Sequence, residues 1–177
     1  MINYIFYGCD TETTGLSFIK NDIIELSLYR LNDDTQKTWF IKPIDISNIE
    51  LSALKVNGHK IEDLRGETKH GKEFYQDARD VIIEIENWLL EDNFPTENRC
   101  LVGHNINFDK TMLEQLWNKC GTPDSFPFGR RYLDTMISEL FFDHCQNNYA
   151  EGYSLKNLSK KEKFYQFKRP FLYLKKY

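Results

Sequence analysis

The sequence lacks any apolar run long enough to cross a membrane, and it contains few of the residues that mark a non-globular chain. Its most apolar short runs, Tyr4 to Tyr7 and Leu140 to Phe142, fall far below the roughly 18 residues of a spanning helix. Only 9 of 177 residues are glycine and 5 are proline, which excludes collagen-like and low-complexity chains. The first residues also lack a basic segment followed by an apolar core, so we expect a cytoplasmic protein with no membrane partner.

Cysteine is also scarce, and its spacing is uninformative for metal binding. Cys9, Cys100, Cys120 and Cys145 form no CxxC pair and no spacing typical of a zinc site. In a chain of this size we therefore expect reduced thiols, and no metal held through sulfur.

The composition is that of a folded domain whose charge is unevenly distributed. Apolar residues make up 41% of the chain and aromatic residues 15%, enough for a conventional core. Residues 156–177 hold eight Lys or Arg and one acid, which leaves 15 bases against 26 acids, a net charge of -11, in residues 1–155. An acidic body cannot attract a polyanion by its overall field, so a nucleic acid would have to be held by metal ions or local contacts.

Hydrophobic patterning predicts a sheet followed by helices and crossovers. Residues 2–9 read as a buried strand that leads into the polar segment 10–15, and residues 22–30 and 36–42 read as two more strands around a turn at 32–34. These three strands predict an antiparallel meander. Residues 52–56 and 61–64 predict short helices on either side of Asn57-Gly58.

The second half of the chain predicts a long helix and a strand–helix–strand crossover. The long helix is indicated by one apolar stripe at helical period, made of Phe74, Ala78, Val81, Ile82, Ile85, Trp88 and Leu89. A strand at 100–104, a helix after Asn105, a strand at 132–135, a helix through Phe142 and another from about Ser154 follow. We therefore predict one α/β domain with a mixed sheet.

Three carboxylates are the candidate site. Asp10 and Glu12 stand two residues apart in extended backbone, a spacing that places both side chains on one face of the strand. Asp109 begins a helix directly after the strand at 100–104, near the sheet edge where ligands bind in α/β folds. Hard oxygen ligands of this kind suit Mg²⁺ or Mn²⁺. Alternatively, Asp10 and Glu12 are solvated strand-end charges, and Asp109 is a first-turn acid that interacts with its helix dipole.

Four ordered motifs resemble those of the DnaQ-like (DEDDh-type) 3'-5' exonuclease family, whose members include the proofreading subunits of bacterial replicative polymerases. They cover roughly residues 3–161. The motifs are Tyr7-Gly-Cys-Asp-Thr-Glu-Thr-Thr-Gly-Leu16 with Ile23-Ile24-Glu25, the segment 49–64, Leu101-Val-Gly-His-Asn-Ile-Asn-Phe-Asp109, and Leu133-Asp-Thr135 followed by Tyr153-Ser-Leu-Lys-Asn-Leu158.

The resemblance implies a ribonuclease H-like fold with an antiparallel meander, βα crossovers and helices on both faces. It implies hydrolysis of phosphodiester bonds at the 3' end of single-stranded DNA or RNA with two Mg²⁺ or Mn²⁺ ions, and it makes a DNA polymerase a further candidate partner. The catalytic and metal-binding residues would be Asp10, Glu12 and Asp109, and the substrate-binding residues would be Thr13, Leu16, Asn105 and Phe108. For Leu16 and Phe108, plain core packing is the alternative.

The chain departs from the family pattern after Leu158. The resemblance calls for a helix carrying His-x-x-x-x-Asp, in which the His is the general base and the Asp completes the metal site, but residues 159–177 contain neither residue. We divide the chain into an exonuclease domain, 1–161, and a basic aromatic tail, 162–177. Three hypotheses stay open: a C-terminus altered by frameshift or truncation, a degenerate member that acts as a non-catalytic nucleic-acid or polymerase-binding module, and substitution by another group. The tail itself is either a solvated basic end or an arm that holds a nucleic-acid strand.

Overall fold

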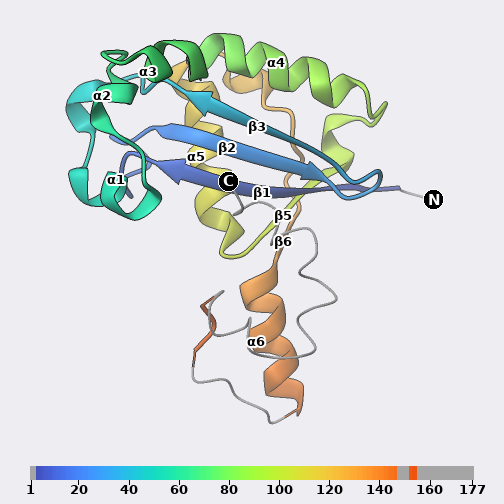
Figure 1. Cartoon of the computed structure of the whole chain (residues 1–177). Helices are drawn as coiled ribbons and strands as arrows, with labels where there is room; N and C mark the ends of the chain where they lie inside the picture. The colour runs from blue at the N-terminus through green and yellow to red at the C-terminus, as the bar shows by residue number, and fades with distance from the viewer. Residues whose placement is uncertain (1–2, 147–151, 155–177) are drawn as a thin grey trace.

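The computed structural model describes residues 3–146 and 152–154. The predicted boundary between residues 161 and 162 and the whole basic tail lie outside these residues, as does nearly all of the helix expected from about Ser154. Within them the chain forms one mixed sheet with helices packed around it (Figure 1).

Six strands form the sheet, in the order β4-β3-β2-β1-β5-β6. The strands are β1 Ile5–Thr13, β2 Ile23–Arg30, β3 Thr35–Ile41, β4 Tyr75–Gln76, β5 Arg99–Gly103 and β6 Tyr132–Asp134. The α-helices are α1 Leu51–Asn57, α2 Ile61–Leu64, α3 Lys69–Phe74, α4 Ala78–Leu90, α5 Ile106–Lys119 and α6 Thr135–Gln146, and short 3-10 turns occupy Ile46–Asn48, Thr96–Asn98 and Pro123–Ser125.

The antiparallel meander predicted from the sequence is confirmed. β1 pairs antiparallel with β2, with Tyr7 opposite Arg30 and Glu12 opposite Glu25, and β2 pairs antiparallel with β3. β1 does not end at Cys9, as the apolar run suggested, but continues through the acidic residues to Thr13. The candidate carboxylates therefore lie within a paired strand and are held by the sheet.

The predicted crossover is also confirmed. β5 lies parallel to β1, with Gly8 opposite Val102, and β6 lies parallel to β5, with Gly103 opposite Asp134. Helix α5 connects β5 to the segment that leads to β6. Because parallel strands end at the same edge, this connection brings the start of α5 to the edge where β1 carries its acids.

Helices contact both faces of the sheet. Alternate residues of one face, such as Trp39, share the main core with α4 and α5, where Val81, Ile85 and Trp117 are fully buried. On the other face Phe40, the next residue of β3, packs against a smaller cluster that includes Leu54 of α1 and Leu64 of α2. The period of two along β3 thus separates the two cores.

The predicted long helix is wrong at its start. Phe74, which the apolar stripe placed in the same helix as Leu89, ends the separate helix α3 and is half exposed. Tyr75 and Gln76 then form β4, which pairs with Phe40 and Ile41 of β3. Asp77 caps the new helix α4, and its side chain accepts a hydrogen bond from Arg79 N–H. Pairing with the sheet edge has overridden the helical periodicity of this segment.

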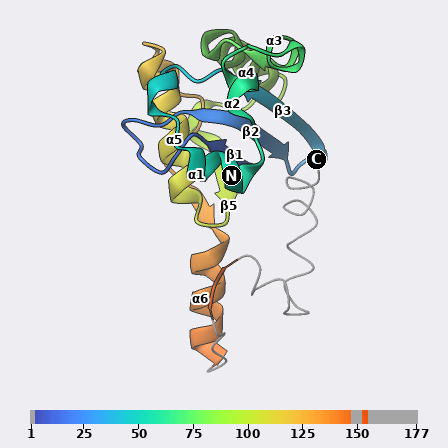
Figure 2. The same ribbon diagram turned by 60° about the vertical axis from the view of Figure 1, so that its left-hand side comes forward.

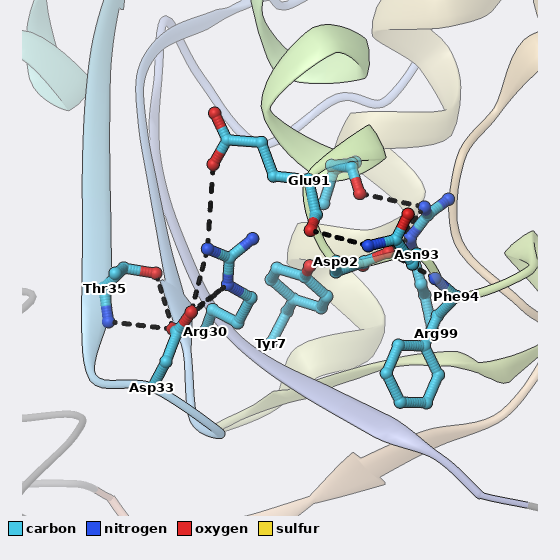
Figure 3. Close-up of polar contacts among 10 residues, drawn as sticks. Tyr7, Arg30, Asp33, Thr35, Glu91, Asp92, Asn93, Phe94 and Arg99 are labelled. Carbon is cyan, nitrogen blue, oxygen red and sulfur yellow. Dashed lines mark hydrogen bonds and ion pairs between the residues drawn. The ribbon is translucent and has the colours of Figure 1, made fainter.

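A network of hydrogen bonds and ion pairs fixes the junction between α4 and β5 (Figure 3). The Asp92 carboxylate, whose side chain is fully buried, accepts bonds from Arg99 at 2.8 and 2.9 Å and from the Tyr7 hydroxyl at 2.6 Å. The backbone N–H of Phe94 adds a fourth bond at 2.7 Å. Arg99 begins β5, so the network ties the end of α4 to β1 and β5 together.

Helix α6 extends from the end of β6 away from the sheet, as both views show (Figures 1 and 2). Several of its apolar side chains are exposed, among them Ile137, Phe141 and Phe142. In the part of the chain that the structure describes, no helix combines the length and the apolar character needed to cross a membrane.

Candidate active site

Asp10 and Glu12 lie on one face of β1, as their spacing predicted. Both are half-buried, whereas Cys9, Thr11 and Thr13, which alternate with them, are buried. The regular register with β2 holds from Tyr7 to Glu12 and changes only between Glu12 and Thr13, at a bulge. The two carboxylates are therefore carried by regular strand, and the chain changes direction immediately after them.

Asp109, in the first turn of α5, is attached directly to this strand. Its Oδ1 accepts a hydrogen bond from Thr11 N–H at 2.9 Å and another from the Thr11 hydroxyl at 2.7 Å. Thr11 stands between Asp10 and Glu12, so the sheet and the helix bring all three acids to the same part of β1. Both hydrogen bonds from Thr11 fall on Oδ1.

Burial makes the Asp109 carboxyl hard to ionise. Its pKa is raised from 3.8 to about 7: desolvation contributes most to the rise, the nearby charge of Asp10 adds to it, and the hydrogen bonds from Thr11 act in the opposite direction. Asp109 forms no ion pair with a described lysine or arginine. Among the residues that the structure describes, Asp109 is thus a buried acid near a second acid, Asp10, without an ion pair of its own.

These residues fit a divalent cation in chemistry and in electrostatics. Carboxylate oxygens are the ligands that Mg²⁺ and Mn²⁺ prefer, and a cation would relieve the repulsion between Asp10 and Asp109. The side chains do not form a closed cluster, however: within residues 3–146 and 152–154, no group of three or more His, Cys, Asp or Glu is arranged to hold a metal ion.

Close packing brings the start of α5 to β1. A Cβ atom on Gly103, the last residue of β5, would lie 2.6 Å from Ile106 Cδ1 and 3.1 Å from the Cys9 carbonyl oxygen. Glycine at this position lets β5 and the first turn of α5 approach β1 closely enough for Asp109 to reach Thr11.

Asn105, a predicted substrate-binding residue, is held at the end of β5 by its backbone. It is exposed, adopts a left-handed conformation with φ 59°, and caps α5. Its N–H donates to Asp134 Oδ1 at 3.2 Å, and the same oxygen accepts from Met136 N–H at 2.9 Å at the start of α6. The Leu-Asp-Thr motif around Asp134 therefore supports the loop that carries Asn105.

The other three predicted substrate-binding residues lie in different environments. Leu16 is 77% exposed, so core packing does not explain it. Phe108 is half-buried, packs against the main core and contacts the Phe18 ring at a centroid distance of 5.5 Å, so core packing explains much of it. Thr13 is buried, and its hydroxyl donates to the Gly15 carbonyl at 2.7 Å, which shapes the turn after β1.

Sequence reasoning missed Thr11. The one available signal was its place on the strand between Asp10 and Glu12. What the sequence could not supply was the register that aligns Thr11 with the first turn of α5.

Sequence comparison gives one partial similarity. The DNA polymerase III PolC-type protein of Lacticaseibacillus paracasei is 30% identical to this chain over 115 residues, which are 65% of this chain and 7% of the polymerase. The chain therefore matches a small part of a much longer protein. No family model matches the sequence.

Structural comparison gives a broader similarity. A structure of exonuclease I matches this chain with a TM-score of 0.71 at 13% identity. The match covers 91% of this chain and 36% of that chain. The zinc-bound form of the E. coli exonuclease I complex with single-stranded DNA matches with a TM-score of 0.61 at 13% identity, over 79% and 30% of the two chains. Identity this low establishes the fold alone, and the predicted ribonuclease H-like fold is confirmed.

Proposed function

Because the partial polymerase match and the exonuclease I fold together support the DnaQ-like exonuclease family, we propose that this chain is a metal-dependent 3'-5' exonuclease. Its substrate in this proposal is the 3' end of single-stranded DNA or RNA, and the catalytic domain comprises residues 1–161. A DNA polymerase is the candidate protein partner, since the sequence relative is a polymerase.

The observation that supports the proposal is the attachment of Asp109 to the strand that carries Asp10 and Glu12. Asp10 and Glu12 share a face of β1, and the hydrogen bonds from Thr11 fix Asp109 against the same strand. A carboxylate buried beside a second carboxylate is unfavourable for folding alone. Such an arrangement is expected where a ligand of opposite charge completes the site.

Each residue has a defined part in the proposed reaction. Asp10, Glu12 and Asp109 would hold two divalent ions, Mg²⁺ or Mn²⁺, which when bound activate a water molecule and stabilise the charge on the phosphodiester. Thr11 keeps Asp109 in one orientation. Leu16, exposed beside the end of β1, is available to the terminal base, and Asn105 and Thr13 shape the two loops that flank the site.

A second candidate function is a non-catalytic nucleic-acid or polymerase-binding module. It is favoured by the lack of His and Asp after Leu158 and by the open arrangement of the acids in the described residues. A positioned general base typically contributes about 10²- to 10⁴-fold to rate, so a chain without one would be slow even with metal bound.

The experiment that separates the two candidates is a single-turnover assay with excess protein. A 5'-labelled single-stranded oligonucleotide, as DNA and as RNA, is incubated with the full chain and Mn²⁺, and its shortening from the 3' end is followed on a sequencing gel. The proposal expects a ladder of products one nucleotide apart. It expects Asp10→Asn to lower the rate at least about 10²-fold, because a metal ligand is lost.

Asp124→Asn is the matched control for this assay. Asp124 is exposed in the turn after α5, at the opposite end of that helix from Asp109, and the same change of acid to amide there should leave the rate unaltered. Binding of the oligonucleotide without any ladder above the Asp10→Asn background would favour the binding module. Neither binding nor shortening would remove both candidates.

A further inference from the structure

The loop between β1 and β2 exposes two large apolar side chains next to the candidate site. Leu16 is 77% exposed and Ile19 is 83% exposed. Burial of such a side chain is favourable, so both are available for a contact that the described residues do not supply. Both lie on the short loop that directly follows the acids of β1, and this position distinguishes them from the other exposed apolar residues.

Buried polar residues hold this loop in one conformation. Asn21, at 1% exposure, accepts a hydrogen bond from Ser17 N–H at 2.8 Å and donates to the Asn48 carbonyl at 2.7 Å. Thr14, which is fully buried, exchanges bonds with Asp22: its N–H donates to the Asp22 carbonyl, and its hydroxyl accepts from Asp22 N–H, each at 2.9 Å. The exposure of the two apolar residues is therefore not the result of a loosely held loop.

Contacts with α5 anchor the same loop from the other side. Lys119 donates to the Asn21 carbonyl and to Asp22 Oδ1, both at 2.7 Å. Phe18, which lies between Leu16 and Ile19, turns inward and packs against Phe108. The loop therefore packs one of its three large apolar side chains, Phe18, against the core and leaves Leu16 and Ile19 exposed to solvent.

Glycine at position 15 is required for this arrangement. A Cβ there would lie 2.5 Å from Glu50 Oε1 and 2.6 Å from the Asn21 side chain. The loop is thus built tightly onto the end of β1, three residues after Glu12.

The surface of the loop combines apolar and positive character. Lys20, exposed next to Ile19, is the first basic residue of a chain whose first 155 residues carry a net charge of -11. An apolar side chain beside an ammonium group matches a nucleotide, which presents a flat base and a charged phosphate. A purely apolar partner would not favour the lysine, and a free phosphate would not favour the isoleucine.

We propose that Ile19 is a second base-contacting residue beside Leu16 and that Lys20 contacts a phosphate of the same strand. This inference rests on the proposed function, since it takes single-stranded nucleic acid as the ligand of the site. Asn21 is then a positioning residue, because it fixes the loop without facing the strand.

Binding measurements with matched variants test the inference without requiring catalysis. A fluorescein-labelled deoxythymidine oligonucleotide is titrated with the full chain in EDTA, and fluorescence anisotropy gives Kd. Ile19→Ser should weaken binding about 3- to 10-fold, because part of the apolar area that covers the base is lost. Ile83→Ser is the matched control, because Ile83 is also an exposed isoleucine, at 56%, on α4; it should change Kd less than 2-fold.

A second probe separates the base from the phosphate. An oligonucleotide with abasic sites at its four 3'-terminal positions should bind wild type more weakly than the normal strand binds Ile19→Ser, because it loses the contact with Leu16 as well as the contact with Ile19. Ile19→Ser should not weaken abasic binding further. Lys20→Gln should weaken both probes alike and reduce the salt slope of log K by about one unit. Ile19→Leu should restore binding, because it restores the apolar area.

The outcomes distinguish this inference from the proposed function. If wild type binds and shortens the oligonucleotide while Ile19→Ser and Ile83→Ser behave alike, the base contact is disproved and the exonuclease proposal stands. If Ile19→Ser weakens binding but wild type shows no shortening, the contact is supported in a binding module. An equal loss on normal and abasic strands would also disprove the base contact.

Discussion

Two buried aspartates at different parts of the sheet have opposite electrostatic environments. Asp92, at the end of α4, has a fully buried side chain that accepts bonds from Arg99, Tyr7 and the Phe94 N–H (Figure 3). Burial acts to raise its pKa, but these bonds outweigh burial and hold the pKa below its ordinary value. Asp109 receives hydrogen bonds from Thr11, and burial together with the charge of Asp10 raises its pKa to about 7 despite them.

The difference is the presence of a cation built into the protein. Arg99 neutralises Asp92, so this carboxylate has its counter-ion within the fold and needs no ligand. Asp109 has no described Lys or Arg partner and stands beside another acid, so its charge is left for a ligand to neutralise. Burial of an acid therefore does not by itself identify a site; an acid buried without its own cation does.

The largest loss of stability is expected from removing Arg99, the cation of the buried Arg99–Asp92 ion pair. Arg99→Met leaves the Asp92 carboxylate buried without its charged donor, a change that typically destabilises by about 3–5 kcal/mol. Urea unfolding followed by circular dichroism measures the loss. Arg65→Met, at an exposed arginine, should alter the free energy of unfolding by less than about 1 kcal/mol. Similar losses in the two variants would show that Asp92 does not depend on Arg99.

The second effect is a gain of stability on metal binding, which should depend on Asp109 and not on Asp92. A divalent cation that binds only the folded chain adds about 2.7 kcal/mol at one hundred times its Kd. Melting temperatures of wild type should therefore rise with Mg²⁺ or Mn²⁺, and the rise should vanish in Asp109→Asn. Asp124→Asn, at an exposed acid, should keep it. An unchanged rise in Asp109→Asn would place the metal elsewhere.

The sequence predicted the meander and the crossover because their patterns are local. Alternation along β1 to β3 and the apolar stripe of α5 are readable within each segment. The break between α3 and α4 was not readable in this way. Tyr75 and Gln76 lie between Phe74 and Ala78 of the helical stripe, and only their pairing with Phe40 and Ile41 of a distant strand makes them extended.

The candidate site was predictable only where its geometry follows from a local pattern in the sequence. The shared face of Asp10 and Glu12 follows from a period of two, so it is visible in the sequence. The contact between Asp109 and Thr11 depends on how close β5 and α5 approach β1, which Gly103 permits and no local pattern encodes. The exposure of Leu16 and the inward packing of Phe108 likewise depend on how the loop after β1 meets α5.

A pH dependence should mark Asp92 as part of the fold. Its pKa in the folded chain is below that in the unfolded chain, so its stabilising contribution is complete above about pH 4. As pH falls further, the unfolded chain takes up the proton first, and the contribution is lost at no more than about 1.4 kcal/mol per pH unit. The difference in unfolding free energy between wild type and Asp92→Asn should therefore shrink below pH 4. A difference that stays constant with pH would contradict the ionised state of Asp92.

The smallest effect is expected from removing one of the two hydrogen bonds from Thr11 to Asp109. Thr11→Val removes the hydroxyl donor to Oδ1, keeps the backbone N–H donor and preserves the shape of the side chain. A single hydrogen bond typically contributes about 1 kcal/mol, so the loss measured by urea unfolding should be smaller than that of Arg99→Met, and Thr11→Ser should restore the donor. The metal-dependent rise in melting temperature should persist, because the N–H bond still orients Asp109. If Thr11→Val were as damaging as Arg99→Met, Asp109 would be as much a part of the fold as Asp92, and its lack of a cation would no longer distinguish it as a ligand site.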